Sequence, residues 1–194
     1  MTLNPIVLIL LFSLISCYQK SELVDVDGNS YQTKLYGERL WMTENLKVFK
    51  DRSGSPVSYF IPGDDTSNIS NFGLLYDFET ACNVCPNGWS LPTKEDWTEL
   101  LQLEVENSAS RFKDQGYWGK EDNTNISQFS IRPAGFGNNE EHHNEFKNKT
   151  LFWSSSKEDE HFIWTVILGL DKDAIRMASQ HPTYAFSVRC IKNK

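Results

Sequence analysis

The apolar residues of this chain gather first in one uninterrupted run near the N-terminus. Residues 6–12 are all apolar, and the first 16 residues contain no charged side chain. This run is much shorter than the roughly 20 residues that a membrane-spanning helix needs. Its length fits the hydrophobic region of a secretory signal. We therefore predict that residues 1–16 are a signal peptide.

A cysteine follows this segment. Leu14-Ile15-Ser16-Cys17 resembles the bacterial lipobox, in which a small residue precedes a cysteine that is diacylated on sulfur and becomes the new N-terminus. An ordinary secretory signal that ends beside a cysteine is the alternative. Each buried methylene contributes about 0.8 kcal/mol, so two or three acyl chains such as palmitate would anchor the protein stably. We predict a lipidated tether over residues 17–23, and Tyr18 in place of Asp favours the outer membrane.

Short-range alternation marks the next stretch, residues 24–42, as three expected strands. Asp27-Gly28-Asn29 and Gly37-Glu38 are the turn signals that separate these strands. Asp25, Asp27 and Asn29 also carry side chains that bind calcium, but their spacing does not match an EF-hand loop. A hairpin turn is therefore the favoured interpretation.

One helix is strongly indicated after Leu91-Pro92. Thr93 and Asp96 have the spacing of a capping box. An apolar stripe at helical spacing follows, formed by Trp97, Leu100, Leu101 and Val105. We expect this helix to end near Glu104 or Glu106 and to pack its stripe against the core.

Two longer stretches are expected to be loop. Residues 51–70 are rich in Gly, Pro, Ser and Asp, and residues 107–149 carry aromatic side chains at irregular spacing. Residues 73–80, between them, are expected to form a strand or one helical turn. Because long loops in compact domains are often functional, we expect a binding surface within residues 107–149.

The C-terminal part predicts four strands, at residues 151–155, 161–170, 174–179 and 185–191. Asp171-Lys172-Asp173 is a plausible hairpin connection between the second and the third. In the last strand Phe186, Val188 and Cys190 share one face, whereas Ser187 and Arg189 share the other. Cys190 is therefore expected to point into the core.

Composition limits the function. A chain of 194 residues with 13% aromatic residues is expected to fold as one domain rather than to be disordered. Its formal net charge of −7 argues against a nucleic-acid partner, whose binding surface would be basic. The sequence contains no P-loop, G-x-S-x-G or dinucleotide-binding motif.

Five segments resemble, in order, the Fibrobacter succinogenes major paralogous domain family: DVDGNSYQT, LWMTENLK, CPNGWSLPTKEDWTEL, FWSSS and YAFSVRC. The likeness covers about Val24 to Lys192. LPTKEDW and the last strand are also similar to formylglycine-generating-enzyme-like domains. The resemblance implies one domain over residues 24–194 with an α+β, C-type-lectin-like fold: a twisted antiparallel sheet core, one or two helices and long loops. Such domains are typical of secreted or surface lipoproteins of Bacteroidetes.

The resemblance also implies a disulfide bond. Cys85 and Cys190 match the positions that look paired in the family, and a bond between Cys82 and Cys190 is the alternative. Cys82 and Cys85 have the C-x-x-C spacing of redox and zinc sites. A zinc site would need a second pair of cysteines, which the sequence does not offer. A thioredoxin-like site would need a βαβ context, whereas Pro86 begins a turn.

Few residues suggest catalysis or metal binding. Formylglycine-generating activity needs reactive cysteines close together, and Cys190 has no near-sequence partner. His181-Pro182-Thr183 lacks the oxygen ligands of a lectin calcium site. His142 and His143 beside Glu145 could ligate a metal, but a solvated loop is the favoured interpretation. The tryptophans apart from Trp118 are expected mainly in the core: Trp41, Trp89, Trp97, Trp153 and Trp164.

Tyr117 and Trp118 are the candidate ligand contacts, because exposed aromatic rings stack on sugars and glycines flank this pair. We expect a non-enzymatic binding module for a glycan or a surface protein of the envelope, anchored in the outer membrane by lipid. A structural, adhesin-like or fimbria-associated component is the first alternative, and an uncharacterised enzyme is the second. We expect no cofactor, no metal and no nucleic-acid partner.

Overall fold

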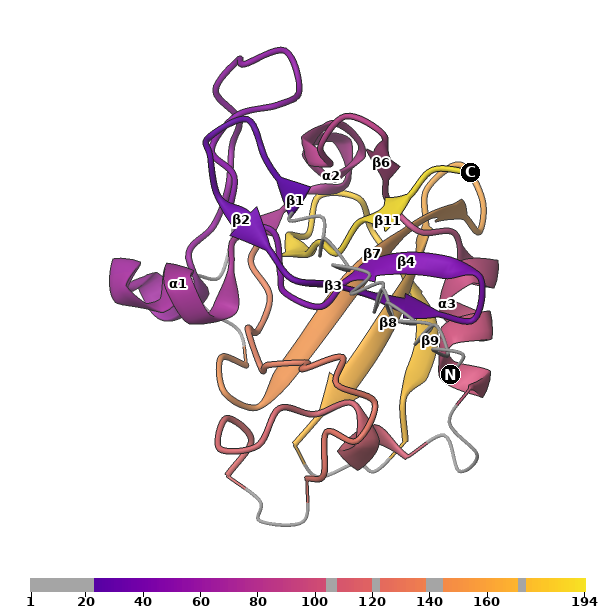
Figure 1. Cartoon of the computed structure of the whole chain (residues 1–194). Helices are drawn as coiled ribbons and strands as arrows, with labels where there is room; N and C mark the ends of the chain where they lie inside the picture. Colours follow the sequence, from indigo (N-terminus) through magenta and orange to yellow (C-terminus); the bar gives the residue numbers. More distant parts are fainter. Residues whose placement is uncertain (1–22, 104–107, 120–122, 139–144, 171–173) are drawn as a thin grey trace, which may run out of the picture.

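The computed structural model describes residues 23–103, 108–119, 123–138, 145–170 and 174–194 (Figure 1). The predicted signal peptide, Cys17 and the turn at residues 171–173 lie outside these ranges. Within them the chain forms three sheets, three short α-helices and long loops, which is the expected α+β fold. No helix in these ranges has the length and apolar character to cross a membrane.

The N-terminal hairpin is closed by the side chain of Asp25. β1 (Leu23–Val24) pairs antiparallel with β2 (Ser30–Tyr31). The Asp25 carboxylate accepts hydrogen bonds from the backbone N–H groups of Asp27 and Asn29, each at 2.9 Å. The hairpin turn is therefore confirmed, and its hydrogen bonds explain why acidic and amide side chains recur here.

The expected second strand is in fact two strands. β3 (Thr33–Tyr36) pairs with β4 (Arg39–Met42), whereas β2 pairs with β1. Between them, the Gln32 N–H donates to the Glu44 carboxylate at 2.6 Å, and the Gln32 C=O accepts from the Thr43 N–H at 3.0 Å. The prediction of three strands is wrong because the chain changes its pairing partner at Gln32.

The larger sheet has the strand order β5-β10-β7-β8-β9. Its strands are β5 (Leu75–Tyr76), β7 (Lys149–Lys157), β8 (Ile163–Gly169), β9 (Arg176–Gln180) and β10 (Phe186–Ser187). Neighbouring strands are antiparallel, except that β10 and β7 run parallel. The expected antiparallel core is therefore a mixed sheet at this pair.

The last expected strand, residues 185–191, is divided between two sheets. After β10 the chain crosses to β11 (Ile191–Lys192), which lies in the four-stranded sheet β3-β4-β11-β6, where β6 is Trp89–Ser90. Cys190 is buried, as predicted, but Ser187 and Arg189 on the opposite face are buried too. A single strand was the wrong prediction, because the crossing segment is enclosed on both sides.

The predicted helix is α3 (Lys94–Gln102). The Asp96 N–H donates to Thr93 Oγ1 at 3.0 Å, and the Thr93 N–H donates to the Asp96 carboxylate at 2.9 Å, so the capping box is confirmed. The helix ends at Gln102, before the expected Glu104.

The expectation of one or two helices is too low. α1 (Ile69–Phe72) is a single turn, and α2 (Phe78–Val84) begins after Asp77, whose carboxylate accepts from the Thr80 N–H at 2.8 Å. This cap and the burial of Ala81 stabilise a helix that begins within residues 73–80, where we expected a strand or one helical turn, and that extends through the cysteine segment to Val84. The loops also contain three 3₁₀ turns: η1 (Pro62–Asp64), η2 (Thr66–Asn68) and η3 (Ala109–Arg111).

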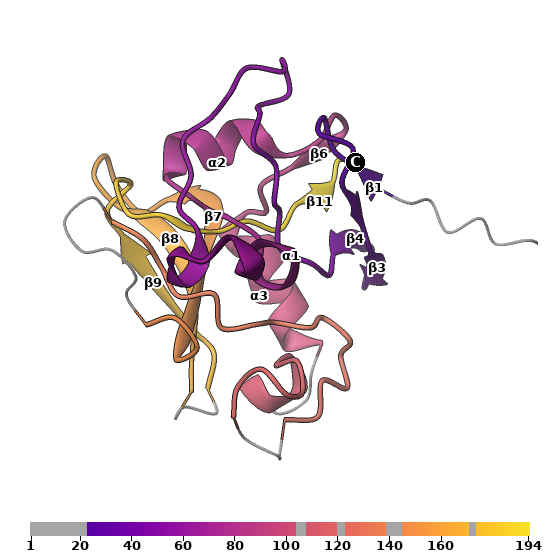
Figure 2. The ribbon, with the colours of Figure 1, turned by 90° about the vertical axis from the view of Figure 1, so that its left-hand side faces the viewer.

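An aromatic core fills the space between the two large sheets, with α3 packed against β7 and β8 (Figure 2). The Trp97 ring of α3 lies 4.8 Å from the Trp41 ring of β4 and 5.4 Å from the Phe152 ring of β7. The Trp97 indole N–H also donates to the Trp153 C=O at 3.2 Å. Large buried rings and one satisfied indole thus hold the helix between the sheets.

Candidate functional site

An open groove lies on the face of β8 that points away from α3. Successive strand residues point to opposite faces, so Val166 and Leu168 enter the aromatic core while Ile167 and Gly169 face the other way. Ile167 and Gly169 form part of a hollow of about 490 Å³. The remaining lining residues are Glu145, Asn148, Lys149, Leu170, Ala174 and Arg176. We call this hollow the sheet groove.

Two cations border the floor of the sheet groove. Lys149 of β7 pairs with Gly169, and Arg176 of β9 pairs with Ile167, so both side chains stand on the groove face, one on each side of β8. A Cβ atom added at Gly169 would meet no heavy atom within 4 Å, so the floor is open there. Lys149 Nζ lies 4.0 Å from the Glu145 carboxylate, and this long, largely exposed pair is weak.

A smaller hollow of about 150 Å³ continues the sheet groove, and the two share Lys149 and Ile167. Its walls are aromatic. The Tyr184 ring is parallel to the Phe186 ring at a centroid distance of 6.0 Å, and the Phe136 ring lies 6.1 Å from Tyr184. Gln180 of β9 adds an amide. Aromatic rings and an amide therefore line the smaller hollow, Arg176 lines the sheet groove, and Lys149 lies where the two hollows meet, with its ammonium 5.8 Å from the Phe136 ring centre.

A buried arginine holds the loop region in which we expected a binding surface. Arg189 is 1% exposed, and its guanidinium donates to the C=O groups of Phe129 and of Ser130, the latter at 2.9 Å. Its Nε donates to Asn45 Oδ1, also at 2.9 Å. These acceptors are all neutral oxygens, and burial lowers the pKa of Arg189 to about 9. Arg189 therefore has a structural role.

The segment around residue 128 is shaped to meet this cation. Asn125, Gln128 and Ser130 have positive φ angles of 46°, 60° and 57°. The Asn125 side chain accepts from the Ser130 N–H at 2.9 Å and donates to Ser130 Oγ at 3.0 Å. Because its carbonyl groups turn inward, this part of residues 107–149 serves the core. Among the described residues within 107–149, those that line the two hollows are Phe136, Glu145, Asn148 and Lys149.

A protein-family model described as the Fibrobacter succinogenes major domain matches residues 35–192, which is most of the chain. The chain belongs to this family. No curated protein and no solved structure matches the chain. The C-type-lectin-like form of the α+β fold therefore stays a prediction.

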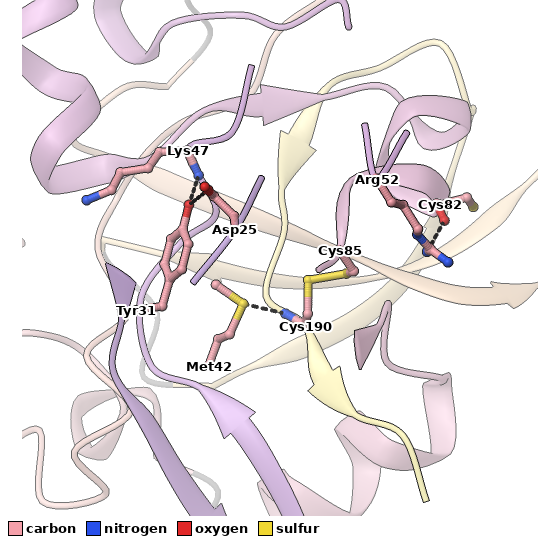
Figure 3. The surroundings of a disulfide bond; sticks show 8 residues. All are labelled: Asp25, Tyr31, Met42, Lys47, Arg52, Cys82, Cys85 and Cys190. Carbon is pink, nitrogen blue, oxygen red and sulfur yellow. Dashed lines mark hydrogen bonds between the residues drawn. A yellow bond between two sulfur atoms is a disulfide. The ribbon is translucent and has the colours of Figure 1, made fainter. Parts of the chain in front are cut away.

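This Fibrobacter succinogenes major domain contains the disulfide bond that the family resemblance implied (Figure 3). Cys85, directly after α2, is bonded to Cys190, which lies between β10 and β11, and their Cα atoms are 5.8 Å apart. The Cys190 N–H donates to Met42 Sδ at 3.3 Å. The bond ties α2 to the segment that crosses between the sheets, and the alternative pairing with Cys82 is not formed.

Cys82 is a free thiol on the surface of α2. Since Cys85 is bonded to Cys190, the C-x-x-C segment does not form a dithiol pair. The surrounding protein raises the pKa of the Cys82 thiol by partial burial, whereas redox cysteines have lowered pKa values. The Cys82 C=O accepts a hydrogen bond from the Arg52 guanidinium at 3.0 Å. The geometry thus gives no support to redox chemistry here.

The expected stacking of Trp118 on a sugar is not compatible with its position. Trp118 is 1% exposed, and its indole N–H donates to the Ile131 C=O at 2.7 Å. Tyr117 is half-buried; its hydroxyl donates to Asn71 Oδ1 at 3.2 Å, and the Arg132 guanidinium lies 4.2 Å from its ring centre. Neither residue lines the sheet groove or its extension. The flanking glycines indicated a loop correctly but not an exposed ring.

The other tryptophans divide as follows. Trp164 of β8 is half-buried, with the Lys94 ammonium 3.4 Å from its ring centre. The remaining four are buried as expected: Trp41, Trp89, Trp97 and Trp153.

The histidines form no metal site in the part of the chain that the structure describes, where no group of three or more His, Cys, Asp or Glu side chains could hold an ion. His161 and His181 are both exposed. His181 Nδ1 lies 2.8 Å from Thr183 Oγ1, a contact within one turn. His142 and His143 fall outside the described residues.

The residues of the sheet groove carry no motif that marks them as a binding site in the sequence. A signal was present for part of the groove, since Arg176 and Ala178 alternate with other residues and share one face of the strand expected at residues 174–179; Gln180 lies on the same face of β9, one residue beyond that expected strand. Which face stays uncovered is not encoded locally, because it depends on where α3 and the loops pack.

Proposed function

We propose that this protein is a lipid-anchored envelope protein that binds a glycan or a surface protein in the sheet groove without transforming it. The observation that carries the proposal is the groove itself, whose floor is open at Gly169 and whose borders combine cations, an amide and aromatic rings. Its volume of about 490 Å³ falls within the range of about 300–1,000 Å³ that is usual for ligand sites.

The polar lining favours binding over hydrolysis. Among the described residues that line the two hollows, Glu145 is the only carboxylate. Most glycoside hydrolases use a pair of carboxylic side chains on opposite sides of the bond that breaks. The lining that the structure describes therefore supplies contacts for a ligand and contains no such pair.

The position of the sheet groove suits an anchored protein. β1, where the described chain begins, and β9, which borders the groove, lie on opposite sides of the molecule in Figure 2. A lipid on Cys17 would be attached only six residues before Leu23 of β1. With β1 nearest the membrane, β9 and the edge of the groove that it forms would lie on the far side of the domain.

A substitution at Gly169 tests the binding site. Gly169→Leu fills the open floor without a backbone penalty, since this residue lies in a strand and has free space above it. Glycan arrays and pull-down from cell envelopes identify a ligand for the wild-type chain. We expect Gly169→Leu to weaken its binding at least about tenfold, a loss of about 1.4 kcal/mol.

Gly169→Ala is the matched control, because it adds one methyl group and leaves most of the groove open. Unchanged ligand binding by Gly169→Leu would contradict the proposed site. Co-purification with a surface assembly, with no ligand sensitive to Gly169→Leu, would favour the structural or adhesin-like alternative instead.

The anchor has its own test. We expect the wild-type protein to sediment with membranes in the absence of detergent, and Cys17→Ala to be released. Cys82→Ala is the control, since it removes a thiol that has no role in the anchor. If Cys17→Ala stays with the membranes, the proposed lipidation is wrong.

A further inference from the structure

We propose that the ligand of the sheet groove is a saccharide that carries carboxylates, such as a glycan of uronic acids. This inference rests on the proposed binding function and names the chemical class of its ligand. It is carried by the charges on the two borders of the groove and by the aromatic hollow that continues it.

Two positively charged side chains border the sheet groove. Lys149 and Arg176 bring two cations to one concave surface of a chain whose net charge is −7. The guanidinium of Arg176 is exposed, and a planar guanidinium binds a carboxylate through two parallel hydrogen bonds. The Lys149 ammonium contacts Glu145 only at 4.0 Å, so a ligand carboxylate can replace this loose partner.

The separation of the cations suits a chain of sugar rings. Lys149 and Arg176 stand on β7 and β9, with β8 between them. Neighbouring strands are about 4.8 Å apart, so these two outer strands are roughly 10 Å apart. This backbone spacing is comparable to the length of a disaccharide, so two carboxylates of one short acidic oligosaccharide can each meet one of the two long, cationic side chains.

The adjoining hollow favours a saccharide over an acidic peptide. Tyr184 and Phe136 offer aromatic faces, against which the C–H groups of a sugar ring pack. Gln180 and Asn148 offer amides, which donate to and accept from sugar hydroxyls. The backbone of an acidic peptide could also bond these amides, but an oligoglutamate has no ring to pack against Tyr184 and Phe136, so the aromatic faces are what favour a saccharide.

Calorimetric titration of the full chain tests the inference with three probes: a short oligogalacturonide, the neutral oligosaccharide obtained by reducing its carboxylates, and an oligoglutamate peptide. We expect the oligogalacturonide to bind at least about tenfold more tightly than the other two. Its binding should weaken as salt is added, because the charges are exposed to solvent.

Single substitutions test whether Arg176 and Lys149 bind the carboxylates of the oligogalacturonide. Arg176→Gln and Lys149→Gln should each weaken oligogalacturonide binding about tenfold, with little effect on the neutral oligosaccharide. Arg52→Gln is the control, because it removes a cation that lines neither hollow. Equal urea midpoints would show that all these variants are folded.

The outcomes separate this inference from the proposed function. If the neutral oligosaccharide binds as well as the acidic one and only Gly169→Leu weakens it, the groove binds glycan but the charge argument is wrong. Tighter binding of oligoglutamate would overturn the saccharide class. If no probe binds, the inference fails, while a ligand from the array that Gly169→Leu abolishes would still uphold the groove.

Discussion

Arg189 Nε donates a hydrogen bond to Asn45 Oδ1 at 2.9 Å, although 144 residues of sequence separate them. The Asn45 amide in turn donates to the Phe72 C=O at 2.8 Å. The other arm of the guanidinium holds the backbone of Phe129 and Ser130. One buried cation thus connects two loops directly, and the end of α1 through Asn45, to the segment that crosses between the two large sheets, and its acceptors are neutral oxygens.

Replacement of Arg189 should destabilise the fold. We expect Arg189→Lys to lower the free energy of unfolding by about 3 kcal/mol, because one ammonium group cannot reach all the acceptors and each buried C=O left unpaired costs about 1–3 kcal/mol. Urea unfolding, followed by tryptophan fluorescence, measures the change. Arg52→Lys, at the surface, should stay within about 0.5 kcal/mol of the wild type. Equal stability of Arg189→Lys would contradict the role given to Arg189.

The disulfide bond should contribute strongly to stability. Cys85 and Cys190 are 105 residues apart, and the chain-entropy estimate for a loop of about 100 residues is about 4.7 kcal/mol. We expect the double variant Cys85→Ala with Cys190→Ala to unfold at much lower urea, whereas Cys82→Ser stays close to the wild type. Peptide mapping without reductant checks the pairing directly, and a bond between Cys82 and Cys190 would refute it.

Substitutions at Trp118 test whether its ring is a core residue or a ligand contact. Because its ring is buried and its indole is hydrogen-bonded to Ile131, we expect Trp118→Ala to cost about 3–5 kcal/mol of stability. Trp118→Phe, which keeps most of the volume but loses the hydrogen bond, should cost less. A variant that unfolds like the wild type but has lost ligand binding would restore the role expected from the sequence.

The Asp27 carboxylate makes the stability of the folded protein depend on pH. Burial would raise the pKa of Asp27, but the hydrogen bond from the Phe49 N–H and the pair with Lys50 at 3.0 Å outweigh it, so the pKa lies below its usual 3.8. A carboxyl with a lower pKa in the folded state gives stability that is present above the unfolded pKa and is lost as pH falls through the folded pKa.

We therefore expect Asp27→Asn to lower the free energy of unfolding at neutral pH, and to have little effect at a pH well below 3.8. Urea unfolding of both proteins across this pH range measures the difference. A difference that does not change with pH would show that the charge of Asp27 makes no contribution.

Features set by near neighbours were predictable from the sequence. The capping box of Thr93 and Asp96 and the turn closed by Asp25 each depend on residues within four positions of one another. The alternation in residues 185–191 correctly indicated that Phe186, Val188 and Cys190 share a face. The pairing of Cys85 with Cys190 came from the family resemblance, since spacing alone left Cys82 as an alternative.

The tertiary structure decided what those local patterns meant. Arg189 and Trp118 are buried because segments distant in sequence cover them, and a sequence pattern does not register such covering. Residues 185–191 serve two sheets because different partners meet each half. The sheet groove exists because α3 packs on one face of β8 and leaves part of the other open beside Gly169. Local hydrogen bonds and periodicity thus determined the elements, whereas long-range packing determined which of their surfaces remain available for a ligand.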